Sequence, residues 1–188
     1  MQNTGISAND ALKKLKSGNE AYIKANCNNA DISEGIREKV CKEGQSPYAV
    51  IVSCADSRVI PENIFMTGIG ELFVIRVAGN VIDNHQLGSI EYATSHLGSN
   101  LVVVLGHTHC GAVGAAISHH SEGYIKSITD EIGIAIGDEK DDYKACCLNV
   151  NRSVSVIEEK LGIKRDGDGG LKAVGAIYHL EDGKVEFL

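Results

Sequence analysis

Short apolar runs rich in β-branched residues alternate with helical segments through the middle of this 188-residue chain. Residues 48–53, 72–77 and 101–105 are typical of buried strands, because they are short and rich in valine, isoleucine and leucine. Between the last two, residues 84–97 carry apolar side chains at helical spacing, and Gly98 predicts where that helix ends. Strands separated by helices predict a parallel α/β sheet, and ligands of such sheets gather at the carboxyl ends of the strands.

Further helices and a final pair of strands complete the predicted elements. In chain order they are a helix from 7–10 to 27–29, helices at 32–43 and 141–161, and a hairpin-like pair of strands at 172–180 and 184–188. The first helix is amphipathic, with Leu12, Leu15, Tyr22 and Ile23 on one face.

The chain has the length of one domain and shows no internal repeat or obvious linker. We therefore predict a single domain over residues 1–188, with an N-terminal helical arm at 1–44 and an α/β core at 45–188. The core should contain a mostly parallel sheet, with about four parallel strands plus a C-terminal antiparallel strand, flanked by helices.

Composition argues against several classes of protein. A net charge of -7 disfavours a nucleic-acid binder and provides no basic patch for anionic membranes. No apolar run approaches the length of a bilayer span, and residues 1–7 lack the pattern of a secretory signal, so we expect a cytoplasmic location. Six cysteines in such a chain are more typical of metal binding or redox chemistry than of a disulfide framework.

Three side chains form a candidate metal-binding set at the predicted edge of the sheet. Cys54 directly follows the first core strand, and His107 and Cys110 follow the third, separated by two residues. Two thiolates and one imidazole suit zinc and leave a fourth tetrahedral position open for water or substrate, as in catalytic sites. Spacing alone leaves open that Cys54 is only a small buried hydrophobe. His109 is a competing ligand, but it directly precedes Cys110, so its side chain should point elsewhere and His107 is preferred.

Asp56 and Arg58 form a second group just beyond Cys54. A guanidinium two residues away can hold a carboxylate in bidentate geometry and keep it ionised. The alternative, an exposed ion pair of little energetic value, is very common. Proximity to a candidate metal ligand favours a functional pair.

The segments C-A-D-S-R-V and G-H-T-H-C-G-A, which contain these residues, resemble the β-class carbonic anhydrase family. That family carries Cys-x-Asp-x-Arg followed by His-x-x-Cys, and the 53-residue interval from Cys54 to His107 is also similar. Supporting matches lie at 15–19, 45–47, 76–80, 88–92 and 174–178. The resemblance therefore extends from about residue 7 to the C-terminus.

This resemblance implies an enzyme that reversibly hydrates carbon dioxide to bicarbonate and a proton, with one Zn²⁺ per chain held by Cys54, His107 and Cys110. Zinc-activated hydroxide would attack the substrate, and the Asp56–Arg58 dyad would orient it. The resemblance also implies that Gln45 hydrogen-bonds a bound bicarbonate and that Gly111 offers backbone near the substrate.

The same resemblance implies a homodimer, or a dimer of dimers, with the N-terminal helix packed on the partner and the active cleft at the interface. Some bacterial members have a second, non-catalytic bicarbonate pocket built from a Trp, an Arg and a Tyr. Arg76 and Tyr178 match the last two, but the chain has no Trp and Ile51 stands in its place. We therefore expect no such pocket.

Two other functions share these residues. Related folds hydrolyse carbon disulfide or carbonyl sulfide with the same ligands, and a zinc-stabilised binding module or bicarbonate sensor would need no turnover. We expect no function for the other cysteines, Cys27, Cys41, Cys146 and Cys147. His119 and His120 could relay protons, but exposed polar residues at a helix end are the default interpretation.

Overall fold

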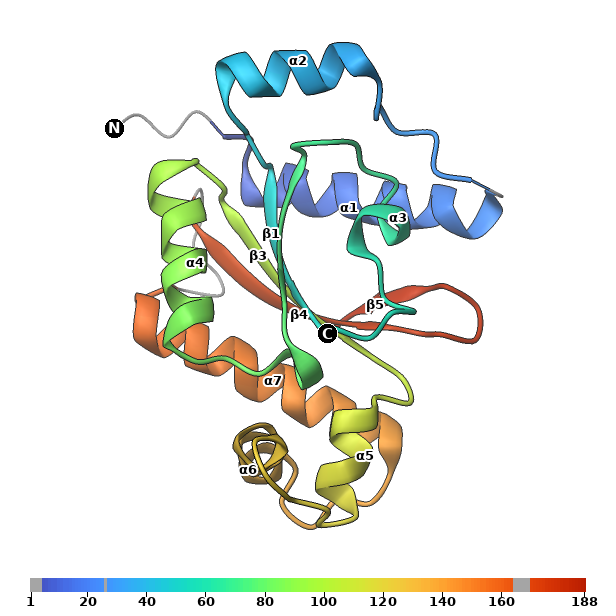
Figure 1. Ribbon diagram of the computed structural model, residues 1–188, viewed down its shortest axis with the longest axis vertical. Helices are drawn as coiled ribbons and strands as arrows, with labels where there is room; N and C mark the ends of the chain where they lie inside the picture. Colours follow the sequence, from blue (N-terminus) through green and yellow to red (C-terminus); the bar gives the residue numbers. More distant parts are fainter. Residues whose placement is uncertain (1–4, 26, 164–169) are drawn as a thin grey trace.

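A five-stranded sheet forms the centre of the molecule in the computed structural model, which describes residues 5–25, 27–163 and 170–188 (Figure 1). The strand order is β2-β1-β3-β4-β5. The strands are β1 (Ala49–Ser53), β2 (Leu72–Arg76), β3 (Leu101–His107), β4 (Lys172–Tyr178) and β5 (Val185–Phe187). The first four are parallel, and β5 is antiparallel to β4. The predicted fold class is confirmed.

Helices cover both faces of this sheet, as Figure 1 shows. One face packs against α1 (Ala8–Lys24) and α3 (Pro61–Ile64). The other packs against α4 (Asn84–His96) and α7 (Asp142–Leu161), while α5 (Gly111–Ile117) and α6 (Ile125–Ile136) extend the same apolar cluster by packing on α7 and η1. Two further elements are α2 (Glu34–Glu43), which has no buried residue, and the short helix η1 (Ala78–Asn80). No helix in the described ranges combines the length and the apolar composition that a membrane crossing requires.

The strands divide their side chains between two apolar layers because successive residues point to opposite faces. Val50 and Val52 of β1 join the layer on the α7 side, whereas Ala49 and Ile51 join the layer on the α1 side. All seven residues of β3 are buried. A strand covered on both faces must be apolar throughout, which explains the continuous apolar runs in the sequence.

Of the two helices in the predicted N-terminal arm, α1 packs against the sheet and α2 does not. Leu15 of the predicted face is buried with Ala8, Ala11 and Asn19, and Leu12 and Tyr22 pack against the same core, so the predicted face is wrong only at Ile23. Ile23 is 42% exposed. The helix begins after Ser7, whose hydroxyl accepts a hydrogen bond from the backbone amide of Asp10. It ends at Lys24, earlier than predicted.

The register of the central strands brings the two ligand segments together. Ser53 at the end of β1 pairs with Leu105 in β3, so Cys54 lies beside the last residues of β3. Helix α5 begins directly after the loop that follows β3. The sequence patterns did not predict α3, η1, α5 and α6. Three of these are seven residues or shorter, too short for a periodic pattern to stand out.

Candidate metal centre

Cys54, His107 and Cys110 meet at the carboxyl edge of the sheet. Cys54 follows β1, His107 is the last residue of β3, and Cys110 is the N-cap residue of α5. Their exposed fractions are 5%, 1% and 3%. Their ligand atoms all lie within 4.8 Å of one another, and the two sulfur atoms are 4.0 Å apart. Within the described part of the chain, no other group of His, Cys, Asp and Glu side chains has this arrangement.

The imidazole of His107 is oriented as a metal ligand requires. Its Nδ1 lies 2.9 Å from the carbonyl oxygen of Thr108, to which it can donate a hydrogen bond. That bond leaves Nε2 as the free ligand atom, and a backbone partner of this kind commonly fixes a metal-binding histidine. Nε2 is fully buried and has no hydrogen-bond partner among the described residues. A buried nitrogen without a partner is costly, and a metal ion would satisfy it.

The two thiols interact with each other. A hydrogen bond from Cys110 lowers the pKa of Cys54, and the same contact raises the pKa of Cys110. The pair therefore loses its first proton readily and its second with difficulty, since two buried thiolates would repel each other. A dication between them removes that repulsion. Zn²⁺ suits this donor set of two sulfur atoms and one imidazole nitrogen.

Asp56 and Arg58 are joined by a bidentate ion pair at the rim of this group. Arg58 Nε donates to Asp56 Oδ1 at 2.9 Å, and Nη2 donates to Oδ2 at 2.7 Å. These bonds hold the pKa of Asp56 well below its usual range, so the carboxylate stays ionised. Oδ2 also lies 3.9 Å from His107 Nε2, so the carboxylate faces the candidate metal position.

His109 lies beside the ligands but faces away from them. Its Nε2 contacts Glu181 at 2.8 Å, and its backbone amide donates to Asp142 in the first turn of α7. Its φ of 54° is uncommon for a residue other than glycine, and these contacts stabilise it. The carbonyl of His109 accepts a hydrogen bond from Arg58 Nη2 at 3.2 Å. The residue therefore supports the dyad, while His107 occupies the ligand position.

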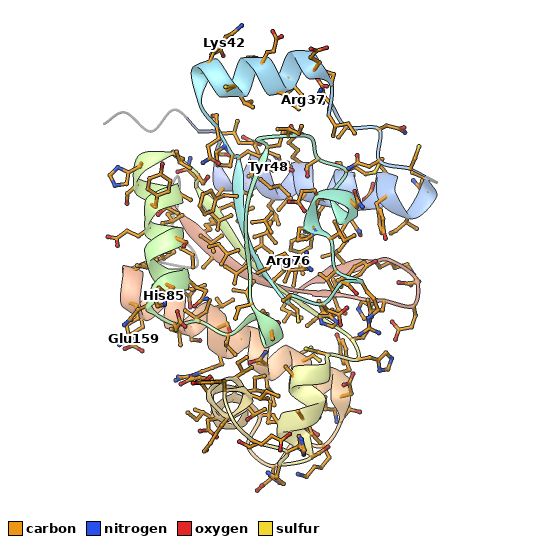
Figure 2. All side chains as sticks on the ribbon, viewed as in Figure 1. Arg37, Lys42, Tyr48, Arg76, His85 and Glu159 are labelled. Carbon is orange, nitrogen blue, oxygen red and sulfur yellow. The ribbon has the colours of Figure 1, made fainter. Side chains whose placement is uncertain are left out.

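Gly111 and Gln45 lie at very different distances from the metal-binding group. Gly111 is the first residue of α5, next to Cys110. Gln45 is exposed and precedes β1, at the amino edge of the sheet. Five strand residues at about 3.3 Å each separate the two edges by roughly 16 Å. In Figure 2, Tyr48 lies beside α1, before β1 begins, and Arg76, the last residue of β2, lies farther along the β1–β2 pair. Gln45 therefore does not reach the ligands of its own chain.

Arg76 and Tyr178, the two matches to a second bicarbonate pocket, have internal partners. Arg76 donates to the carbonyl oxygens of Cys54 at 3.2 Å and of Asp56 at 2.6 Å. The hydroxyl of Tyr178 lies 3.0 Å from that of Tyr22. Arg76 therefore holds the backbone of the segment that carries Cys54 and Asp56.

Residues that the sequence analysis did not select lie behind the ligands. The amide of Gly79 in η1 donates to Cys54 Sγ at 3.3 Å. Two polar residues of α7, Asn149 and Ser153, are buried against η1. Cys146, also on α7, is buried in the same cluster as Cys54 and Cys110. Asn149 and Ser153 could have been identified from the sequence, because they are polar residues four positions apart within the apolar face of the 141–161 helix.

Comparisons with known proteins point to one family. The model of the carbonic anhydrase family matches residues 49–185. The chain is 36% identical to carbonic anhydrase 2 of Mycobacterium tuberculosis over 197 aligned residues, covering 98% of this chain and 94% of that protein. It is 38% identical to a carbonic anhydrase of Mycolicibacterium smegmatis, covering 94% and 91%.

Solved structures agree with the sequence matches. The fold is similar to a β-carbonic anhydrase of Sordaria macrospora, described as tetrameric, with a TM-score of 0.69 and 25% identity, covering 82% of this chain and 87% of that one. A β-carbonic anhydrase of Aspergillus fumigatus has a TM-score of 0.68 and 26% identity, covering 82% and 86%. Matches over nearly the whole chain, together with the Cys-His-Cys group, show that this protein belongs to the β-carbonic anhydrase family of enzymes.

Proposed function

We propose that this chain is a zinc enzyme that reversibly hydrates carbon dioxide to bicarbonate and a proton, acting as a single-domain unit of residues 1–188. One observation supports this function above the others. His107 Nε2 lies buried and unpaired beside two thiols, and the ionised carboxylate of Asp56 faces it at 3.9 Å. A purely structural metal site has no need of an ionised carboxylate at its open position.

Cys54, His107 and Cys110 would hold the metal. Zn²⁺ bound there would activate water by lowering its pKa to about 7, which makes hydroxide available at neutral pH. Asp56 Oδ2 would accept a hydrogen bond from the attacking oxygen and so aim its lone pair at the carbon of carbon dioxide. Arg58 keeps that carboxylate ionised and fixed, so Asp56 acts as an acceptor only.

Gly111 and Gln45 would contact the substrate in different ways. Gly111 adjoins Cys110 at the start of α5, where its backbone can face the bound substrate. Gln45 is separated from the ligands of its own chain by the length of β1, so it would enter the site of a second copy. We therefore propose a homodimer, or a dimer of dimers, in which each site combines residues of both subunits.

The tetrameric assembly named for the Sordaria macrospora relative supports an oligomer of this kind. We also propose a cytoplasmic location. All six cysteines lie in the described residues as free thiols, and a reducing compartment would keep Cys54 and Cys110 available as ligands.

Stopped-flow hydration of carbon dioxide by the zinc-loaded protein tests this proposal, with the chelator-treated protein as its control. We expect rapid proton release that requires zinc. Sulfide release from carbon disulfide or carbonyl sulfide is measured on the same samples. Sulfide release without carbon dioxide hydration would indicate the alternative hydrolase, and zinc binding without turnover of any of the three would indicate a binding module.

A further inference from the structure

The amide of Gly79 is aimed at the sulfur of Cys54 by an unusual stretch of backbone. It donates to Sγ at 3.3 Å. Gly79 and Asn80 both have positive φ angles, 68° and 45°. A side chain at position 79 would also collide with its neighbours, because a Cβ there would lie 2.7 Å from Ile132 Cδ1. Consecutive left-handed residues are not favoured by the backbone itself, so other contacts must maintain this turn.

Those contacts come from two side chains on one face of α7. Asn149 Nδ2 donates to the carbonyl oxygen of Gly79 at 2.8 Å, and Ser153 Oγ donates to that of Asn80 at 3.1 Å. The two residues are four positions apart, so they project from successive turns toward η1. They are 2% and 3% exposed. Because both side chains are buried, each bond holds its carbonyl with little competition from solvent.

We propose that Asn149 and Ser153 are positioning residues that hold the Gly79 amide on the Cys54 sulfur and thereby set the affinity of the site for Zn²⁺. This inference rests on the proposed zinc function. The chain of contacts runs from α7 through the Gly79–Asn80 backbone to Cys54, a candidate metal ligand. Hydrogen-bond partners one step removed from a metal orient its ligands, and their loss typically weakens metal binding about 10–100-fold.

The simpler alternative is that Asn149 and Ser153 only satisfy their own hydrogen bonds in the core. Their loss would then reduce folding stability without changing the metal site. Val154, fully buried on the same helix and next to Ser153, provides a matched control. Its truncation to alanine removes buried packing but no side-chain hydrogen bond to η1.

The test measures Zn²⁺ affinity by competition with a chromogenic chelator for wild type, Asn149→Leu, Ser153→Ala and Val154→Ala. Circular dichroism first establishes that each protein is folded. We expect affinity to fall about 10–100-fold in Asn149→Leu and by a smaller factor in Ser153→Ala. Val154→Ala should bind Zn²⁺ like the wild type, although its metal-free form unfolds at a lower temperature.

Cobalt substitution adds a readout that a merely structural role would not change. The sulfur-to-cobalt charge-transfer band of Co²⁺-loaded protein should shift in Asn149→Leu and Ser153→Ala but not in Val154→Ala. Should Asn149→Leu fail to fold, Ser153→Ala decides by the same two measurements. Wild-type affinity and spectrum in every folded variant would overturn this inference alone. A wild type that binds no Zn²⁺ would overturn the proposed zinc function as well.

Discussion

The metal centre and the segment formed by α2 and Gln45 differ in what surrounds them. At the centre, the side chains of Cys54, His107 and Cys110 are almost completely buried by their own chain. Helix α2 has no buried residue, and Gln45 after it is exposed. Figure 1 shows α2 on the outside of the molecule, beyond α1.

Because of this difference, we expect metal binding and substrate binding to depend on different parts of the enzyme. Metal binding needs only contacts within one chain, because all three candidate ligands and the dyad meet at one edge of one sheet. Our proposal for the substrate pocket needs a second chain, because Gln45 lies at the opposite edge. Changes at the centre should therefore act within a subunit, and changes at Gln45 should act across the interface.

The largest effect is expected from His107→Ala. This change removes one of the three candidate metal ligands, so the protein should lose stoichiometric zinc and all measurable hydration activity. Zinc content by atomic emission and stopped-flow hydration measure both. His109→Ala is the matched control and should retain zinc, because that imidazole contacts Glu181 instead. If His109→Ala lost zinc and His107→Ala retained it, His109 rather than His107 would be the metal ligand.

Asp56→Asn should leave zinc content unchanged and lower the hydration rate about a hundredfold or more, because an amide cannot serve as the anionic acceptor held by Arg58. The comparison of zinc content with the maximal rate separates this role from metal binding. Unchanged activity would show that Asp56 does not orient the nucleophile.

Gln45→Ala should reduce activity about tenfold, the value of one lost hydrogen bond to the substrate. A mixed dimer of Gln45→Ala with His107→Ala then distinguishes the two arrangements. If Gln45 acts across the interface, the Gln45→Ala subunit has its zinc and receives glutamine from its partner, so one intact site results. If Gln45 acted within its own chain, neither site would be intact. Purification through two different tags and a hydration assay measure the outcome.

The smallest effect on activity is expected from alkylation of Cys27 and Cys41, which are exposed and outside the metal centre. Iodoacetamide at about pH 8 should modify these two first, since thiolates are the reactive form. Burial raises the pKa of Cys146 to about 12, so that residue should remain a protected thiol. Peptide mass mapping measures the extent of alkylation at each cysteine. Rapid loss of activity together with modification of Cys41 would contradict this separation.

Much of the fold followed from local patterns in the sequence. Each central strand is covered on both faces and therefore carries a continuous apolar run, as in residues 101–105. The packing face of helix α1 was predicted only in part, because the predicted apolar face included Ile23, which is 42% exposed. Periodicity identifies an amphipathic helix, but which part of its apolar face packs on the sheet depends on residues far away in the chain.

The sequence by itself determined the candidate ligands, because Cys54, His107 and Cys110 directly follow strands whose carboxyl ends must meet in a parallel sheet. Only the tertiary structure decided how those ligands are supported and which residues stay apart from them. Asn149 and Gly79 are 70 positions apart and meet only because α7 packs over η1. Gln45 is nine positions from Cys54, yet an extended strand holds the two at opposite edges of the sheet.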